Sequence, residues 1–190
     1  MHGTGWRGGL IYVPSGAGKD SLLSALRSHA HGLPLAFVRR YITRPADTGA
    51  ERHIPVSRER FEELSAMGRF SLQWASHGCR YGIPSAWDHL LESGISLLVN
   101  GSRTAFPLAR QRYPNILPVL ISAPPALLYA RLLARGRESH EEREERLRAA
   151  FTPIPEEESV TQWIHIENAG SLQEAVLKLV NALRATLTSL

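Results

Sequence analysis

The residues from Pro14 to Ser21, Pro-Ser-Gly-Ala-Gly-Lys-Asp-Ser, have the composition of a loop that binds phosphate. Small residues let consecutive backbone N–H groups curve around an anion, and a following helix adds the positive end of its dipole. An ordinary glycine-rich turn explains the small residues but has no need of a lysine, which in a phosphate loop contacts the β- and γ-phosphates of a nucleotide. We therefore predict that ATP is bound by Val13, Pro14, Ser15, Gly16, Ala17, Gly18, Lys19, Asp20 and Ser21.

The loop departs from the full pattern GxxxxGK[ST] at two positions. Val13 stands where the first glycine is expected, and Asp20 stands where the final Ser or Thr is expected. The Asp20 carboxylate could hold Mg²⁺ directly or through water, with a hydroxyl supplied by Ser21. Asp20 could equally complement the dipole at the start of a helix. The sequence leaves both roles open.

The elements around this loop alternate between strand and helix. An apolar run at 10–13 precedes the loop, and Leu22, Leu23 and Leu26 follow with helical spacing. Further strands are expected at 35–42, 95–100, 116–122 and 163–167, with helices at 85–92, 103–112, 125–136, 140–150 and 171–187. This alternation predicts an α/β fold with a parallel sheet flanked by helices and right-handed crossovers.

The stretch from 43 to about 84 breaks the alternation, because short β-like pieces surround one helical piece. We expect one domain over residues 1–190, with a core at 9–42 and 84–190. A small mixed insertion is expected at about 43–83 and a lid at about 136–158, including a connector rich in Pro and Glu at 152–159.

The composition, 43% hydrophobic and 21% charged, is that of an ordinary globular chain. The net charge of +4 could mark a nucleic-acid surface or arginines gathered around a phosphate pocket. Arg far outnumbers Lys and no basic run is interrupted by aromatics, which favours the pocket. Cys79 is the single cysteine, and the sequence shows neither a signal peptide nor a membrane span. We expect a cytoplasmic protein with small-molecule partners and neither nucleic acid nor membrane among them.

Several motifs occur in a fixed order: GAGKDS, RxYxTRP, FxxxxxxGxFxxxW, HGxxYGIP and RLLARGRE. Together they resemble the guanylate kinase family, and more closely the ribose 1,5-bisphosphate phosphokinases of bacterial phosphonate breakdown. The resemblance extends from Leu10 to about Leu179. It implies a P-loop nucleotide kinase fold that uses ATP and Mg²⁺.

The resemblance also implies an acceptor site. Arg44 stands where these kinases contact the acceptor phosphate and the transferred group, and Tyr81 matches a tyrosine that binds acceptor phosphate. His53 falls where a second such tyrosine is expected. Arg40 replaces a serine and adds a donor suited to a second phosphate, although lining a strand edge explains it nearly as well.

Guanylate kinases read guanine with a glutamate, a Ser or Thr, and an acidic segment. This sequence has Gln73, Ile83 and Asn100 at those positions, with Ser102 completing the last segment. An amide offers one acceptor oxygen and Ile83 offers no hydrogen bond, so GMP is disfavoured. We expect Arg40, Arg44, His53, Gln73, Tyr81 and Asn100 to bind the acceptor.

By the same resemblance, Arg135 and Arg146 are the lid arginines that close over the phosphates. Phosphoryl transfer depends on positioning and on neutralising negative charge. We therefore expect catalysis by Lys19, Arg44, Arg135 and Arg146, producing 5-phosphoribosyl 1-diphosphate from ATP and ribose 1,5-bisphosphate. The alternatives are a guanylate kinase and a guanylate-kinase-like module that binds proteins without catalysis.

Overall fold

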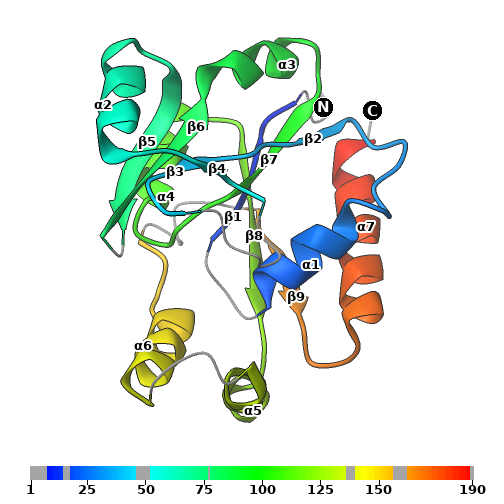
Figure 1. Ribbon diagram of the computed structural model, residues 1–190. Helices are drawn as coiled ribbons and strands as arrows, with labels where there is room; N and C mark the ends of the chain where they lie inside the picture. Colours follow the sequence, from blue (N-terminus) through cyan, green and yellow to red (C-terminus); the bar gives the residue numbers. More distant parts are fainter. Residues whose placement is uncertain are drawn as a thin grey trace.

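The computed structural model describes residues 8–14, 18–45, 52–76, 78–135, 140–155 and 162–188 (Figure 1). Two sheets organise this part of the chain, one of five strands and one of four. Among the described residues, no helix combines the length and the apolar character that crossing a membrane requires.

The five-stranded sheet is parallel throughout and has the order β2-β7-β1-β8-β9. Its strands are β1 (Leu10–Val13), β2 (Leu35–Phe37), β7 (Ser96–Asn100), β8 (Ile116–Ser122) and β9 (Ile164–Glu167). This arrangement confirms the predicted parallel α/β sheet. β1 is buried along its whole length, as expected of a central strand covered on both faces.

Successive residues of β1 supply the two faces of this sheet. Ile11 and Val13 pack on one face against α1 (Lys19–Leu26) and α7 (Leu172–Leu187). Leu10 and Tyr12 pack on the other face, where α4 (Phe106–Arg112) contributes Phe106. The two-residue period of a strand thus separates two apolar clusters, one on each side of the sheet.

The four-stranded sheet is mixed, with the order β4-β3-β6-β5. β3 (Tyr41–Ile42) runs parallel to β4 (Ile54–Pro55), and β6 (Cys79–Pro84) runs antiparallel to both β3 and β5 (Phe70–Ser76). Helix α2 (Arg58–Ala66) covers one face, where Phe61 stacks on Phe70 with ring centroids 4.6 Å apart. The mixed pairing agrees with the small mixed unit expected here.

The predicted strand at 35–42 is wrong as a single element. β2 ends at Phe37, and the Val38 N–H still donates to the Leu98 carbonyl of β7 at 3.0 Å. The chain then leaves that sheet, and the Arg40 carbonyl accepts from the Ile54 N–H of the other sheet at 2.8 Å. One apolar run therefore supplies two strands, because its halves find hydrogen-bond partners in different sheets.

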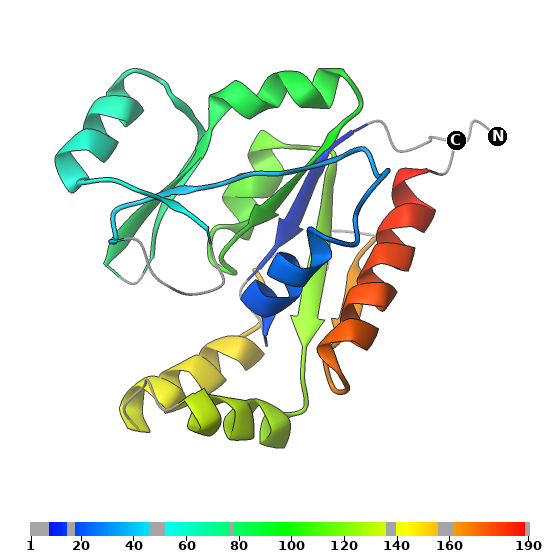
Figure 2. The same cartoon turned by 45° about the vertical axis from the view of Figure 1, so that its right-hand side comes forward.

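Two helices lie beyond the carboxyl end of β8. They are α5 (Pro125–Arg135) and α6 (His140–Phe151), and both views place them at this edge of the sheet (Figures 1 and 2). They pack on each other through Leu128, Leu132, Leu147 and Ala150. Between β6 and β7, a short 3₁₀ turn (Ser85–Trp87) leads into α3 (Asp88–Glu92).

Candidate functional site

The junction between β1 and α1 places Lys19 at the first position of the helix. Gly18, immediately before it, has φ +76°, a left-handed conformation that favours glycine. A Cβ at Gly18 would also lie 2.5 Å from the Asn168 side-chain nitrogen, so that side chain would have to shift. Ser15, Gly16 and Ala17, which were also predicted to bind ATP, lie outside the described residues.

Val13 belongs to the core of the fold rather than to the turn. It is fully buried, pairs with Asn100 in β7, and packs in the cluster under α1 and α7. Its carbonyl accepts from the Gly101 N–H at 2.9 Å. A branched apolar residue here is explained by strand packing, so the departure from the glycine pattern needs no special turn geometry.

The Lys19 amine lies between two side chains from neighbouring elements, α1 and β7. It donates to Asp20 Oδ1 at 2.7 Å and to Asn100 Oδ1, while Asn100 Nδ2 donates to Asp20 Oδ1 at 3.1 Å. Lys19 is 8% exposed. Asn100 is the last residue of β7, so the parallel sheet brings together residues 80 positions apart in the sequence.

Asp20 stays ionised in this arrangement. Burial raises the pKa of its carboxyl, but the charges of Lys19 and Arg40 and the hydrogen bonds from Lys19 and Asn100 lower the pKa by more. A carboxylate beside the phosphate loop can supply one oxygen ligand to Mg²⁺, which usually takes few protein ligands and completes its shell with water and phosphate. Within the described residues no three His, Cys, Asp or Glu side chains are grouped to hold a metal. The arrangement fits an ion shared with a nucleotide.

Arg40 lies in the segment that joins the two sheets and is 6% exposed. Its guanidinium carbon is 5.0 Å from the centroid of the Tyr81 ring and 5.7 Å from that of Trp74. The two rings stack with centroids 5.3 Å apart and an interplanar angle of 6°. Cation–π contact and burial hold the guanidinium in place, so the structure brings Arg40 and Tyr81 together as predicted site neighbours.

His53 precedes β4 and is 5% exposed. Its Nε2 is 3.2 Å from the carbonyl of Arg44, whose side chain is exposed at the end of β3. Its Nδ1 is buried and makes no hydrogen bond to the described residues, and the same holds for Trp74 Nε1. Buried polar atoms in this state are rare and often face a water or a ligand.

Gln73 does not join this cluster. Its Oε1 accepts from Ser65 Oγ of α2 at 2.9 Å. In β5 the side chains of Leu72 and Trp74 pack in the core with Ile83, and Gln73 between them points to the opposite face. Gln73, which was predicted to bind the acceptor, is therefore hydrogen-bonded to α2 in this structure.

Tyr12 is a core residue that supports the segment after Asn100, a contact that the sequence did not reveal. Its hydroxyl donates to the Ser102 carbonyl at 2.8 Å and accepts from the Ser102 N–H at 3.0 Å. A Cβ at Gly101 would lie 2.0 Å from the Tyr12 ring, so the ring packs directly on the backbone that follows Asn100. Burial raises the pKa of Tyr12 to about 12. The only sequence signal was an aromatic residue in an otherwise aliphatic strand.

Two arginines attach the α5 and α6 helices to the core. Arg103 donates to the carbonyls of Thr152 at 2.5 Å and Ala150 at 2.8 Å, at the end of α6. Arg131, in α5, donates to the carbonyls of Asn168 at 2.8 Å and Gly170 at 3.3 Å, after β9. Arg135 and Arg146 lie in α5 and α6, and their side chains fall outside the described part of the structure.

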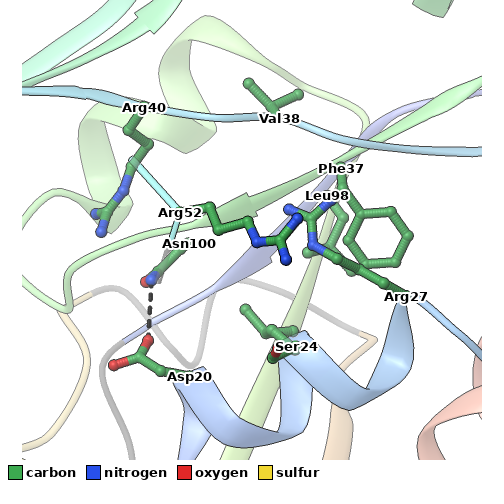
Figure 3. Close-up of a pocket in the computed structure, with 10 residues that line it drawn as sticks. Asp20, Ser24, Arg27, Phe37, Val38, Arg40, Arg52, Leu98 and Asn100 are labelled. Atoms are coloured by element: carbon green, nitrogen blue, oxygen red, sulfur yellow. Dashed lines mark hydrogen bonds between the residues drawn. The ribbon is translucent and has the colours of Figure 1, made fainter. Parts of the chain in front are cut away.

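Asp20, Asn100 and Arg40 line a common pocket (Figure 3). It lies between α1 and the ends of β2 and β7, with Asp20 and Asn100 at one end and Arg40 beside them. The site therefore combines an end formed by β1, α1 and β7, where nucleotide binding is predicted, with a cationic wall of Arg40 and Arg52 from segments next to the second sheet.

Comparison with curated proteins gives a consistent set of relatives, although no family model matches the sequence. Ribose 1,5-bisphosphate phosphokinases are 46% identical over 168 residues in Desulfomicrobium baculatum, 42% over 174 in Burkholderia pseudomallei and 44% over 179 in Azotobacter vinelandii. The alignments cover 87%, 90% and 91% of this chain and 88%, 92% and 96% of the relatives.

Comparison with solved structures identifies the fold. The guanylate kinase from Anaplasma phagocytophilum superposes with a TM-score of 0.66 at 21% identity, covering 96% of this chain and 88% of that one. This likeness confirms the predicted guanylate-kinase-like architecture.

Proposed function

The chain belongs to the family of ribose 1,5-bisphosphate phosphokinases, and from this membership we propose that it transfers the γ-phosphoryl group of ATP to ribose 1,5-bisphosphate. The observation that carries the proposal is the identity of 42–46% over about nine tenths of the chain to three proteins of that name. In the proposed reaction the bond from the γ-phosphorus to the β–γ bridging oxygen breaks. An oxygen of the acceptor 1-phosphate forms the new bond, giving ADP and 5-phosphoribosyl 1-diphosphate.

The geometry supports a mechanism based on charge and positioning. A phosphate oxygen is already ionised at neutral pH, so the acceptor needs no general base. Lys19 lies at the phosphate loop, next to Asp20 and Asn100, where it can neutralise charge on the transferred group. Mg²⁺ bound at Asp20 would neutralise phosphate charge, and Arg44, Arg135 and Arg146 are proposed to complete the set of cations.

The acceptor end of the site favours a phosphorylated sugar over a nucleotide base. Ile83 is fully buried and has no polar group, at the position where the resemblance to guanylate kinases predicts Ser or Thr. Arg40 takes the place of a serine and presents a buried guanidinium to the same region. A guanidinium pairs well with phosphate oxygens and poorly with the donor edge of guanine.

The test measures ADP release with ribose 1,5-bisphosphate and with GMP as acceptors, under the same ATP and Mg²⁺ concentrations. We expect kcat/KM for the sugar bisphosphate to exceed that for GMP by at least about a thousandfold, because mismatched polar groups in a closed site are heavily penalised. The product is identified by mass. Equal turnover of GMP would assign the chain to the guanylate kinase activity, and no ADP release with either acceptor would favour the protein-binding alternative.

Substitutions at Ile83 and Arg40 sharpen this test. Ile83→Ser restores a hydroxyl at the base-reading position, and Arg40→Ser restores the residue expected in guanylate kinases. The double variant should lose activity toward ribose 1,5-bisphosphate and gain measurable activity toward GMP. If both activities fall in parallel, these two positions do not select the acceptor.

A further inference from the structure

The pocket beside Lys19 continues along one face of α1. Asp20, Leu23, Ser24 and Arg27 line it, and their spacing of three, four and seven residues places all of them on the same side of the helix. Phe37, Val38 and Leu98 form the opposite wall. The pocket therefore has a nucleotide end at Asp20 and a far end at Arg27, separated by about 10 Å of helix rise.

The far end holds a second arginine from a different element. Arg52, in the segment before β4, lines the same pocket, and Figure 3 shows its guanidinium beside that of Arg27. Arg27 stacks over the Phe37 ring, with its guanidinium carbon 4.6 Å from the ring centroid. Arg39 fixes the Arg52 segment by donating to the carbonyls of Arg52 at 3.3 Å and His53 at 3.1 Å.

These arginines repel one another. Partial burial lowers the pKa of Arg27, and the charges of Arg52 and Arg39 lower it further. Within the described ranges, the ion pairs made by carboxylates involve Lys19, Arg60, Arg80 and Arg112, and none reaches Arg27 or Arg52. Asp20, the acid that lines the pocket, is held at the other end by Lys19 and Asn100.

Two adjacent guanidinium groups cost free energy in the free protein and bind a dianion strongly, because its charge turns their repulsion into attraction to a shared partner. A guanidinium also presents paired N–H donors that match the oxygens of a phosphate group. Apolar walls along the pocket strengthen this attraction by lowering the local dielectric constant. The far end thus has the chemistry of a phosphate subsite.

We propose that Arg27 and Arg52 bind the phosphate of the acceptor that is not attacked, the 5-phosphate of ribose 1,5-bisphosphate. The proposal rests on the function proposed above and assigns a place to the second phosphate of that substrate. The attacked 1-phosphate lies toward Lys19, the sugar lies in the pocket beside Arg40, and the 5-phosphate reaches the two arginines. The subsite selects acceptors that carry phosphate at both ends.

The variants Arg27→Met and Arg52→Met, alone and together, test the assignment. Methionine keeps an unbranched apolar side chain and removes the charge. We expect the KM for ribose 1,5-bisphosphate to rise by about tenfold for each arginine removed, since the loss of one charge-assisted hydrogen bond corresponds to roughly that factor. The KM for ATP should change by less than about threefold, because the two arginines lie at the far end of the pocket from Lys19 and Asp20.

Arg184→Met serves as the matched control. Arg184 is exposed in the last turn of α7, outside the pocket, and its loss changes the net charge by the same amount. If this control raises the acceptor KM as much as Arg27→Met does, the effect is one of overall charge, and the subsite assignment is wrong.

Binding measured by calorimetry separates the subsite from general attraction and from turnover. Wild-type protein should bind ribose 1,5-bisphosphate more tightly than ribose 1-phosphate, and the double variant should lose most of this preference. If the double variant keeps the preference for ribose 1,5-bisphosphate over ribose 1-phosphate, the assignment is wrong. It is also wrong if the two arginines bind inorganic phosphate but their removal leaves this preference unchanged. Failure of the proposed function would be distinguished from failure of the subsite assignment, because the wild-type protein would then release no ADP.

Discussion

Tyr12→Phe is the substitution whose consequences follow most directly from the geometry. Phenylalanine keeps the ring that packs on Gly101 and, at 5.7 Å between centroids, on Phe106. It removes the hydroxyl that accepts from the Ser102 N–H and donates to its carbonyl. Because the substitution removes two hydrogen bonds at a fully buried side chain, we expect the free energy of unfolding to fall by about 1–3 kcal/mol at pH 8.

The same substitution has a predictable pH dependence. The pKa of Tyr12 is raised from 10.0 to about 12 in the folded protein, chiefly by burial. A raised pKa means that the folded state keeps the proton after the unfolded state has lost it. The stability that Tyr12 contributes is therefore complete below pH 10 and is lost between pH 10 and 12, by about 1.4 kcal/mol per pH unit. The cost of Tyr12→Phe should shrink by about 1.4 kcal/mol between pH 8 and pH 11.

Tyr113→Phe provides the comparison. The pKa of Tyr113 is also raised to about 12, by burial first and then by the nearby Asp88, so this variant should show the same trend with pH. Its hydroxyl bonds Ser71 and Asp88 and makes no hydrogen bond to the segment that follows Asn100. Of the two variants, Tyr12→Phe alone should therefore lower kcat, because Tyr12 contacts the backbone that follows Asn100 and Tyr113 does not.

Urea unfolding followed by circular dichroism at pH 8 and pH 11 gives the stabilities, and ADP release at pH 8 gives kcat. A destabilisation by Tyr12→Phe that is the same at both pH values would refute the reasoning, because the hydroxyl would then not be protonated and buried as described. Equal effects of both tyrosine variants on kcat would refute the link to Asn100.

Two further predictions concern the cations. Lys19→Met should reduce kcat by at least about a hundredfold while leaving the far-UV circular dichroism unchanged, because the amine binds Asp20 and Asn100 and is not part of an apolar core cluster. A near-normal kcat would show that Lys19 is not catalytic. Arg135→Ala should lower kcat by more than it weakens ATP binding at equilibrium, since a lid arginine acts on charge that develops during transfer. A rise in KM with unchanged kcat would instead show that Arg135 binds the substrate and the transition state equally well.

Much of the fold could be predicted from local patterns. The strands at 10–13 and 116–122 are short apolar runs, and the last helix carries its own start signal, a capping box between Ser171 and Glu174. The strand before GAGK and the helix that follows it were predictable in the same way, and the structure shows both. In each case the relevant interactions lie within a few residues of one another.

Interactions between distant residues could not be predicted in the same way. The residues at 35–42 have the pattern of one strand, and only the hydrogen bonds of Val38 to β7 and of Arg40 to β4 show that they divide between two sheets. The shift in register of β5 between Phe70 and Leu72 is likewise a feature that no composition reveals. The contact of Tyr12 with Ser102 and the pairing of Arg27 with Arg52 depend on the sheet order in the same way.

The distribution of the site over two sheets gives the second phosphate a role beyond affinity. Arg27 directly follows α1, which packs on the five-stranded sheet, whereas Arg40, Arg52 and His53 lie in the segments that lead to β3 and β4 of the mixed sheet. A phosphate held by both Arg27 and Arg52 therefore ties the acceptor-binding unit to the helix that begins with Lys19. Binding energy from a group that does not react can in this way fix the orientation of the group that does. It follows that an acceptor without the second phosphate loses alignment at Lys19 as well as affinity, so that its kcat falls together with its binding.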